Sequence, residues 1–316
     1  MNRTSQKRLN AGRITKILLL VVLTGVMIYL YLTYKAHSPF IIYQVRVPRL
    51  ILALLCGLIL GGVGSVYQIM LNNPLAEPYI LGVSSGAALG SVVAIIIGLY
   101  LFVPLFAFAG ALLTMLMVWY LSQLGGYFSS IKLLLSGIIV GMFCSAFISL
   151  LMYLNLRDIG SIIGVLMGNL GHIFTVEEWR LFLILGLFSL ILSGYLYSLS
   201  NQLNICSSGD LIATNVGVNV TKLRRNVFIV SSLLIGFIVS YAGIIGFVGL
   251  IVPHLIRMMY GNDQKRVFLL SSVGGALLLI GCDFIAMHVI VIEIPIGIIT
   301  SFIGCPFFIY CFAKRK

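Results

Sequence analysis

The sequence predicts an all-α, polytopic membrane protein with about ten transmembrane helices, and three observations support this fold class. Of the 316 residues, 60% are hydrophobic and only 9% are charged, whereas about 25% of the residues of an ordinary soluble domain are charged. The apolar residues form long runs, and ~20 such residues in a helix cross the hydrocarbon core. The runs also lack the alternation of polar and apolar residues that membrane-spanning β-strands show.

Basic and turn-forming residues divide the chain into the expected spans. About ten helices of ~20 residues leave no room for a sizeable soluble domain, so residues 1–316 are interpreted as one transmembrane domain. A basic segment, 1–13, precedes the first span, which lacks a convincing cleavage site and is expected to remain as an uncleaved helix. The expected spans are 14–34, 47–70, 79–99, 102–122, 131–154, 178–200, 226–243, 245–260, 267–287 and 295–312.

Charge predicts the orientation of these spans. The net charge of +12 resides mostly in short connectors and at the ends of the chain, which indicates membrane topology better than a nucleic-acid partner. With basic connectors inside, both termini are expected in the cytoplasm of a bacterial cell, bounded by its inner membrane. Two long connectors, 155–177 outside and 201–225 inside, are each expected to hold short helices. Spans two to five and seven to ten begin on opposite faces, which predicts an inverted repeat.

Glycine is abundant, with 33 residues. Many glycines lie in small-residue patches, of which 57–64 and 82–90 are the clearest. Such patches let helix backbones approach closely, so close packing is their expected role.

The chemistry of an enzyme is missing from the sequence. No phosphate-binding loop of the G-x-x-x-x-G-K-[ST] type occurs, so any ATP hydrolysis is expected from a partner. The eight acidic residues and four histidines show no metal-ligand spacing, and the six cysteines form no C-x-x-C pair. We therefore assign no catalytic, cofactor-binding or metal-binding residue.

Several motifs resemble one family of membrane proteins. They combine polar, proline and glycine positions that apolar composition alone would not produce, and they run in order from residue 46 to the C-terminus. They are RVPR at 46–49, NPLAEP at 73–78, LGVSSGAALG at 81–90, LLLSG at 133–137, FVGLIVPHLIR at 247–257 and EIPIGIITSFIGCPFFIY at 293–310. In these stretches the chain resembles the permeases of iron-siderophore, haem and vitamin B12 ABC importers, the type II importers.

The resemblance implies partners. A permease of this kind pairs with a second permease, identical or paralogous, with two cytoplasmic ABC ATPases and with an extracytoplasmic substrate-binding protein. The resemblance also implies that Arg46 and Arg49 receive acidic residues of the binding protein, whereas the alternative role is anchoring to membrane lipid. Relatives often carry a third arginine in the ninth span, at the stretch that here reads DFIAMH at 283–288. This arginine is absent here, and whether His288 replaces it stays open.

The cytoplasmic connector resembles the family's coupling loop, whose short helices insert into the ATPase. The residues that fall on the family pattern are Gly209, Asp210, Ala213, Gly217 and Val218. An ordinary solvated connector is the alternative, but Leu211, Ile212 and Val216 would then expose apolar surface to water. Ser129 and Ser130 lie where relatives close a cytoplasmic gate, and an ordinary turn is the alternative there.

Three classes of function compete. The first is a non-enzymatic permease subunit of an ATP-driven importer, with a ferric siderophore favoured as cargo and haem or cobalamin as alternatives. A stand-alone secondary transporter of a metal complex would require an acidic coupling site in the membrane, and an integral membrane enzyme would require clustered catalytic groups. The sequence favours the first class.

Overall fold

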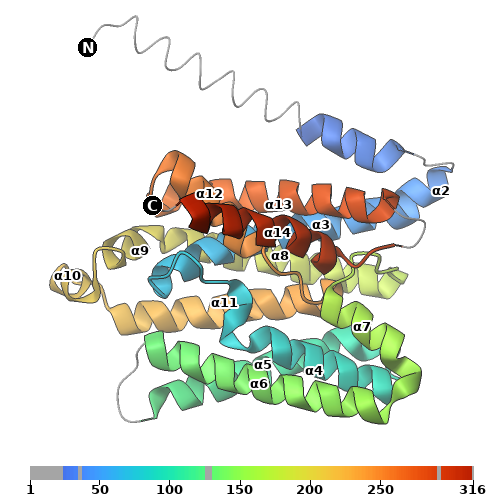
Figure 1. The fold of residues 1–316 in the computed structure, drawn as a ribbon, viewed down its shortest axis with the longest axis horizontal. Helices are drawn as coiled ribbons and strands as arrows, with labels where there is room; N and C mark the ends of the chain where they lie inside the picture. Colours follow the sequence, from blue (N-terminus) through green and yellow to red (C-terminus); the bar gives the residue numbers. More distant parts are fainter. Residues whose placement is uncertain (1–23, 35–37, 125–129, 290–292, 315–316) are drawn as a thin grey trace, which may run out of the picture. The chain divides into compact units, whose positions relative to one another are not determined.

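The computed structural model describes residues 24–34, 38–124, 130–289 and 293–314. Their internal contacts define two units, Met1–Ile51 and Leu52–Lys316, and each unit is described by itself. Regular structure in the described residues is helical (Figure 1), which confirms the all-α prediction. Within these residues, six helices are long and apolar enough to cross a membrane, and four shorter apolar helices accompany them. Each expected span overlaps one of these helices.

The first unit holds a short helix and the beginning of a longer one. The helix Thr24–Thr33 covers the described part of the first expected span, whose residues 14–23 lie outside the described residues. After it, Ser38 caps α2 (Pro39–Ile41), because its Oγ accepts a hydrogen bond from the Phe40 amide. A π-helical turn, Ile42–Arg46, then leads into α3 (Val47–Met70). Such turns inside helices are frequent at functional sites.

The second unit contains the remaining helices, most of which match the expected spans within a few residues. The long connector 155–177 holds the short helix α7, as expected. The connector expected at 201–225 ends earlier than expected, because α11 begins at Val220, where the Asn219 side chain accepts a hydrogen bond from the Lys222 amide. The longer helices are α5 (Val103–Gln123), α6 (Ser130–Leu154), α8 (Val176–Ser198), α11 (Val220–Ala242), α13 (Gln264–His288) and α14 (Ile296–Lys314). The shorter helices are α4 (Val83–Ile96), α7 (Ile159–Met167), α9 (Ser200–Cys206), α10 (Asp210–Asn215) and α12 (Val248–Tyr260).

Two of the helices that occupy expected spans are too short to cross a bilayer alone. The helices α4 and α12 contain 14 and 13 residues, whereas a full crossing requires ~20. Each follows irregular backbone that ends in a left-handed residue, Gly82 at φ 77° and Phe247 at φ 70°. The Glu77 carboxylate accepts a hydrogen bond of 2.7 Å from the Phe247 amide, so the irregular segment before α4 holds the beginning of α12.

The same order of helix types occurs twice along the chain, and the two copies run in opposite directions. A long helix, an irregular segment, a half-length helix and two further helices occur as α3 to α6 and again as α11 to α14. The turn after α4 lies beside α7, because the Tyr100 hydroxyl donates to Asp158. The turn after α12 lies beside α9, because the Asn204 amide donates to Asp263. Since α7 and α9 lie at opposite ends of this unit (Figure 1), the half-length helices point in opposite directions, as an inverted repeat requires.

Small residues allow these helices to pack closely. A Cβ at Gly61 of α3 would overlap the Ser271 carbonyl of α13, and a Cβ at Gly64 would overlap the backbone of Gly249 in α12. In the other patch, a Cβ at Gly86 of α4 would overlap the Thr114 side chain of α5. The packing role predicted for both glycine patches is therefore confirmed.

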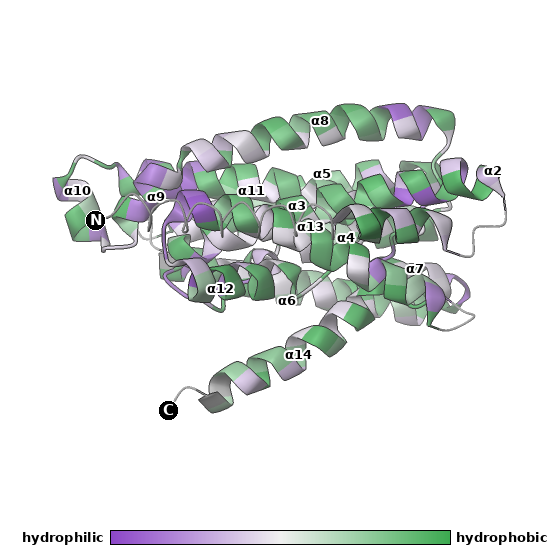
Figure 2. Cartoon of the chain, turned by 90° about the horizontal axis from the view of Figure 1, so that it is seen from above, coloured by the Kyte–Doolittle hydropathy of each residue, from purple (hydrophilic) through white to green (hydrophobic). Residues whose placement is uncertain are grey.

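Burial distinguishes central from peripheral helices. In α11, 78% of the most apolar window is buried, compared with 28% in α8, so α8 exposes an apolar surface along most of its length. Figure 2 shows hydrophobic residues along α5, α8 and α11 and hydrophilic residues around α9 and α10. This distribution suits helices surrounded by lipid, with α9 and α10 beyond the apolar layer.

Candidate functional site

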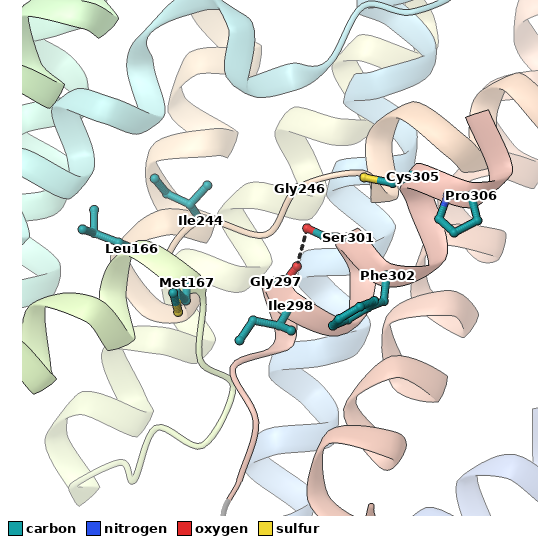
Figure 3. A pocket seen from close by; sticks show the side chains of 10 residues that line it. All are labelled: Leu166, Met167, Ile244, Gly246, Gly297, Ile298, Ser301, Phe302, Cys305 and Pro306. Atoms are coloured by element: carbon teal, nitrogen blue, oxygen red, sulfur yellow. Dashed lines mark hydrogen bonds between the residues drawn. The ribbon is translucent and has the colours of Figure 1, made fainter. Parts of the chain in front are cut away.

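A cavity of about 640 Å³ lies between the end of α7, the segment before α12, and α14 (Figure 3). Among the described residues that line it, none is charged, and most are apolar. The Ser301 hydroxyl donates a 2.6 Å hydrogen bond to the Gly297 carbonyl of its own helix. Because the walls offer few unsatisfied polar groups, they suit contact with a bulky molecule without strong retention of it.

The second feature is the pair of short helices α9 and α10. Two glycines bound α10, since Gly209 precedes it at φ 114° and Gly217 follows it at φ 92°, values that favour glycine. Ala213 is fully buried, and its carbonyl accepts a 2.9 Å hydrogen bond from the Val218 amide. These four sequence-predicted residues therefore determine the shape of α10.

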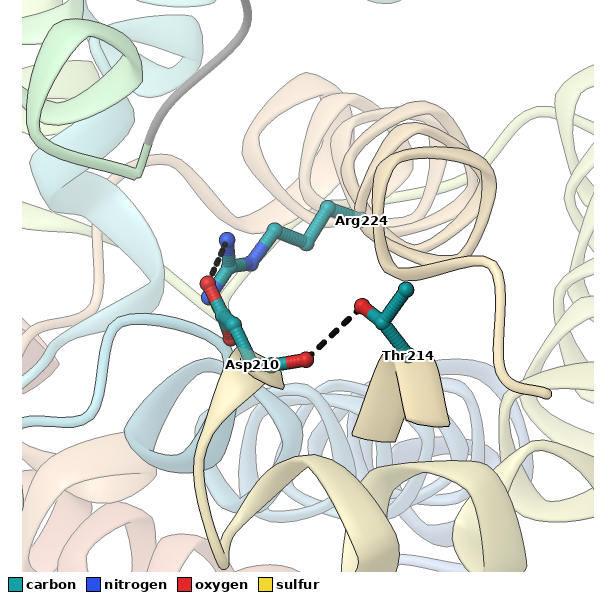
Figure 4. A network of polar contacts seen from close by, with 3 residues as sticks. All are labelled: Asp210, Thr214 and Arg224. Carbon is teal, nitrogen blue, oxygen red and sulfur yellow. Dashed lines mark hydrogen bonds and ion pairs between the residues drawn. The ribbon is translucent and has the colours of Figure 1, made fainter. Parts of the chain in front are cut away.

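Asp210, the fifth residue of this set, fixes α10 onto α11. Both of its carboxylate oxygens accept hydrogen bonds of 2.8 Å from the Arg224 guanidinium, a bidentate geometry that specifies orientation. The Thr214 hydroxyl donates to the Asp210 main-chain carbonyl at 2.8 Å (Figure 4). The Asp210 side chain is 51% exposed, so the pair is expected to contribute at most about 1 kcal/mol to stability.

The outer surface of α10 is apolar. Leu211, Ile212 and Val216 are 83%, 53% and 65% exposed, and we call them the α10 apolar face. Since α10 lies in the hydrophilic end of the unit (Figure 2), lipid does not account for this exposure. An exposed apolar face of this kind marks an interaction surface.

A network of polar side chains lies beneath α9 and was not predicted from the sequence. The Gln264 main-chain amide donates a 2.7 Å hydrogen bond to the Asn204 side-chain oxygen. The Gln264 side chain donates to Ser65 Oγ at 3.0 Å and accepts from Arg257 Nη2 at 2.8 Å. We call Asn204, Gln264, Arg257, Ser65 and Gln68 the base network. The one sequence feature that could have indicated this network is Arg257, a cation within an apolar segment.

The network joins helices that are distant in sequence. Arg257 of α12 also donates to the Ser65 carbonyl of α3 at 2.9 Å, and its Nε lies 3.4 Å from Gln68 Oε1. In return, the Gln68 amide donates to the Leu250 carbonyl of α12 at 3.2 Å. Buried polar groups with satisfied partners fix one arrangement of the helices that carry them, so α3, α12 and α13 are held together at this end.

The two arginines expected to receive a binding protein lie in the first unit. Arg46 Nη1 donates to the carbonyls of Tyr31 and Leu32, at 3.0 and 3.2 Å. A cation at the end of the helix Thr24–Thr33 complements the helix dipole. Arg46 and Arg49 are buried, with 8% and 3% of their surface exposed. They occupy positions i and i+3 of a helical run and therefore neighbouring positions on one face.

The remaining sequence-predicted residues are placed as follows. His288 ends α13, and its Nδ1 lies 2.8 Å from the Phe284 carbonyl one turn earlier. Ser129 lies outside the described residues. Ser130 begins α6, but its side chain lies outside the described part of the structure. The expected cytoplasmic gate therefore stays a prediction.

Comparison with known proteins gives consistent matches over most of the chain. The model of the FecCD transport family matches residues 14–314. An uncharacterized ABC transporter permease, YvrB of Bacillus subtilis, is 38% identical over 85% of this chain and 77% of its own length. The hemin transport system permease HmuU of Yersinia pestis is 34% identical over 86% of this chain and 83% of its own length.

A solved structure has the same fold. It is described as an inward-facing conformation of a proposed metal-chelate type ABC transporter, and it superimposes with a TM-score of 0.84 at 33% identity. The alignment covers 95% of this chain and 99% of the solved chain. The cobalamin import permease BtuC of Halobacterium salinarum is 35% identical over 87% of this chain and 74% of its own length.

Proposed function

Because this chain belongs to the FecCD transport family, we propose that it is the membrane-spanning permease subunit of an ATP-driven importer for an iron chelate. The observation that carries the proposal is the family match over residues 14–314, and the α10 apolar face supports it. The sequence lacks a phosphate-binding loop, so ATP hydrolysis requires a partner. The α10 apolar face is a surface on which such a partner can bind.

The α9–α10 element is the proposed contact with the ATPase. Gly209, Gly217 and Ala213 give α10 its shape, and Asp210 fixes its orientation through Arg224. The α10 apolar face then inserts into a groove of the ATPase. A rigid element of this kind converts closure of two ATPases into a rigid-body movement of the attached helices. A second permease subunit, identical or paralogous, completes the translocation pathway.

Arg46 and Arg49 are the proposed contacts for the substrate-binding protein. Carboxylates of the binding protein would replace the main-chain carbonyls that Arg46 contacts in the free chain, since a charge-assisted hydrogen bond is about twice as strong as a neutral one. Such a contact fixes the register of the complex and accelerates encounter. His288 lies at a helix end of the same expected face and is a further candidate for this surface.

Basic residues support the proposed orientation. Lys132, Lys222, Arg224, Lys265 and Arg266 belong to connectors or helix ends on the side of α9 and α10. The positive-inside rule places this side in the cytoplasm. Both termini then lie in the cytoplasm, and α7 lies at the outer face of the bacterial inner membrane.

The cargo is proposed from the relatives. Hemin, cobalamin and iron chelatin occur in the names of similar permeases, and all denote bulky metal complexes. We favour a ferric siderophore, with haem and cobalamin as alternatives. The apolar cavity beside α14 suits a pathway that releases such a cargo readily, and Ser129 and Ser130 are proposed for its cytoplasmic gate.

The ATPase contact can be tested with Leu211→Glu in the full-length permease in nanodiscs. A carboxylate in an apolar interface requires costly desolvation, so we expect the affinity for the ABC ATPase that co-purifies with the wild type to fall at least tenfold. Leu211→Met, which keeps the apolar volume, should bind normally. Unchanged affinity of Leu211→Glu would remove α10 from the proposed interface. The alternative, a secondary transporter, predicts that no ATPase co-purifies.

A further inference from the structure

Within the described part of the chain, the α9–α10 element has two polar attachments to the rest of its unit. One is the Asp210–Arg224 pair, which connects α10 to α11. The other is Asn204 of α9, which connects to the beginning of α13 through Asp263 and Gln264. The first attachment lies within the stretch that the sequence identifies as functional. In the second attachment, Asn204 lies in the same connector but is not one of the residues that fall on the family pattern, and Asp263 and Gln264 lie outside the motifs.

Asn204 uses both ends of its side-chain amide. Its nitrogen donates a 3.0 Å hydrogen bond to Asp263 Oδ1, and its oxygen accepts the 2.7 Å hydrogen bond from the Gln264 main-chain amide. Asp263 is also the N-cap of α13 and accepts from the Lys265 amide. Asn204 therefore supplies a second acceptor at the same helix end, where main-chain amides lack partners within the helix.

From Gln264 the contacts continue inward. Gln264 is fully buried, and its side chain bonds to Ser65 of α3 and Arg257 of α12. Arg257 reaches α3 again through the Ser65 carbonyl. A displacement of α9 relative to α13 would break the Asn204 contacts first, because α3, α12 and α13 are joined by the rest of the base network and by close glycine packing.

We infer that Asn204 is a positioning residue that transmits movement of the α9–α10 element to the α3–α12–α13 body. The inference rests on the proposed function, in which the ATPase moves α10. Without Asn204, α10 would still bind the ATPase through its apolar face and would still move α11 through Arg224. The half-length helix α12 and its neighbours would no longer follow.

Hydrogen–deuterium exchange in the assembled complex tests this inference. Full-length permease and its co-purifying ABC ATPase are placed in nanodiscs, and amide exchange is compared between the nucleotide-free state and the state trapped with ATP and vanadate. In the wild type we expect ATP to change exchange in residues 200–219 and also in 248–270. In Asn204→Ala we expect the change in 200–219 to remain and the change in 248–270 to be lost.

The swapped pair Asn204→Asp/Asp263→Asn serves as a rescue. The carboxylate introduced at position 204 would keep an acceptor for the Gln264 main-chain amide. The side-chain amide introduced at position 263 would donate to that carboxylate, and asparagine remains a good N-cap for α13. We expect the double variant to recover the change in 248–270. Asn201→Ala, an exposed asparagine on the same helix, is the control and should behave as the wild type.

The outcomes distinguish the inference from the proposed function. If the permease binds the ATPase but Asn204→Ala keeps the full response in 248–270, Asn204 does not transmit movement and the inference is wrong. If no ATPase binds the wild type, the proposed function fails and the inference fails with it. Should Asn204→Ala not assemble, Asn204→Asp alone decides: a response in 248–270 equal to that of the swapped pair contradicts the inference.

Discussion

At the scale of single residues, Asp210 orients α10 through its contact with Arg224. Its two hydrogen bonds of 2.8 Å to the guanidinium determine how α10 meets α11, although the pair is largely on the surface. Asn204 does the same for α9 and α13. Both residues lie beneath or beside the surface that is proposed to meet the ATPase, so we expect them to affect the orientation of that surface.

Exchange of the two charges tests the role of the Asp210–Arg224 pair. Because an exposed pair contributes at most about 1 kcal/mol, we expect Asp210→Asn to weaken ATPase affinity up to about fivefold. The reversed pair Asp210→Arg/Arg224→Asp should regain most of this loss, as measured by titration of the ATPase onto permease nanodiscs. A double variant weaker than both single variants, Asp210→Arg and Arg224→Asp, would contradict a role based on mutual attraction.

The two arginines that are proposed to dock the binding protein lead to a prediction with an internal control. Arg46→Glu/Arg49→Glu should weaken binding of the cognate substrate-binding protein about thirtyfold or more, because loss of a buried charge-assisted contact costs about 2–5 kcal/mol. Arg157→Glu changes the same charge at an exposed position expected on the same face and should have a small effect. Biolayer interferometry on nanodiscs measures binding to both variants and to the wild type. Equal effects would indicate general attraction and not a docking pair.

Helix packing operates at the scale of elements. The helix α3 contacts α12 and α13 through glycine backbones, and a Cβ at Gly61 would meet the Ser271 carbonyl. By contrast, a Cβ at Gly160 of α7 would meet nothing within 4 Å. Alanine at Gly61 would change both packing and helix propensity, whereas alanine at Gly160 would change helix propensity alone.

Gly61→Ala should therefore destabilise the protein, by about 1–3 kcal/mol for overpacking. Gly160→Ala should be neutral or stabilising, since alanine favours a helix by about 1 kcal/mol over glycine. Thermal unfolding of the purified permease, followed by fluorescence, gives the order of the two variants. A Gly61→Ala variant as stable as the wild type would show that α3 can move away from α13 without loss.

Elements were predictable from the sequence to different degrees. Long apolar runs predicted α5, α6, α8 and α13, because length and hydropathy alone determine such helices. The early start of α11 was missed, since the cap Asn219 precedes a basic cluster that resembles a connector. The base network was missed because it joins residues almost 200 positions apart, as in the Gln264–Ser65 bond, and hydropathy carries no information on such pairs.

The residues of α10 also show that the sequence alone does not reveal tertiary contacts. Family motifs located Asp210 and Ala213, but only coordinates show that Ala213 is buried and that Leu211 is exposed. The motif residues thus shape α10, whereas the α10 apolar face lies between them. Burial depends on tertiary contacts, which local sequence does not encode.

At the scale of the whole molecule, the helices form an inverted repeat, and the α9–α10 element lies at one end of the second unit (Figure 1). The half-length helices α4 and α12 point toward opposite ends of their unit, and α12 ends beside α9. The proposed movement of α9 and α10 would therefore act on the repeat that contains α12 more directly than on the other. Alternating access arises when one repeat moves against its counterpart.

The most direct test of the central claim is the energy source of uptake. Proteoliposomes that contain the permease and its ABC ATPase, with the binding protein outside and ATP inside, are supplied with a radiolabelled ferric hydroxamate as probe, with hemin and cobalamin tested in parallel. We predict ATP-dependent uptake of one of these probes that persists when ionophores abolish all ion gradients. Uptake that needs no ATPase and disappears with the ion gradients would contradict the assignment as an ATP-driven importer.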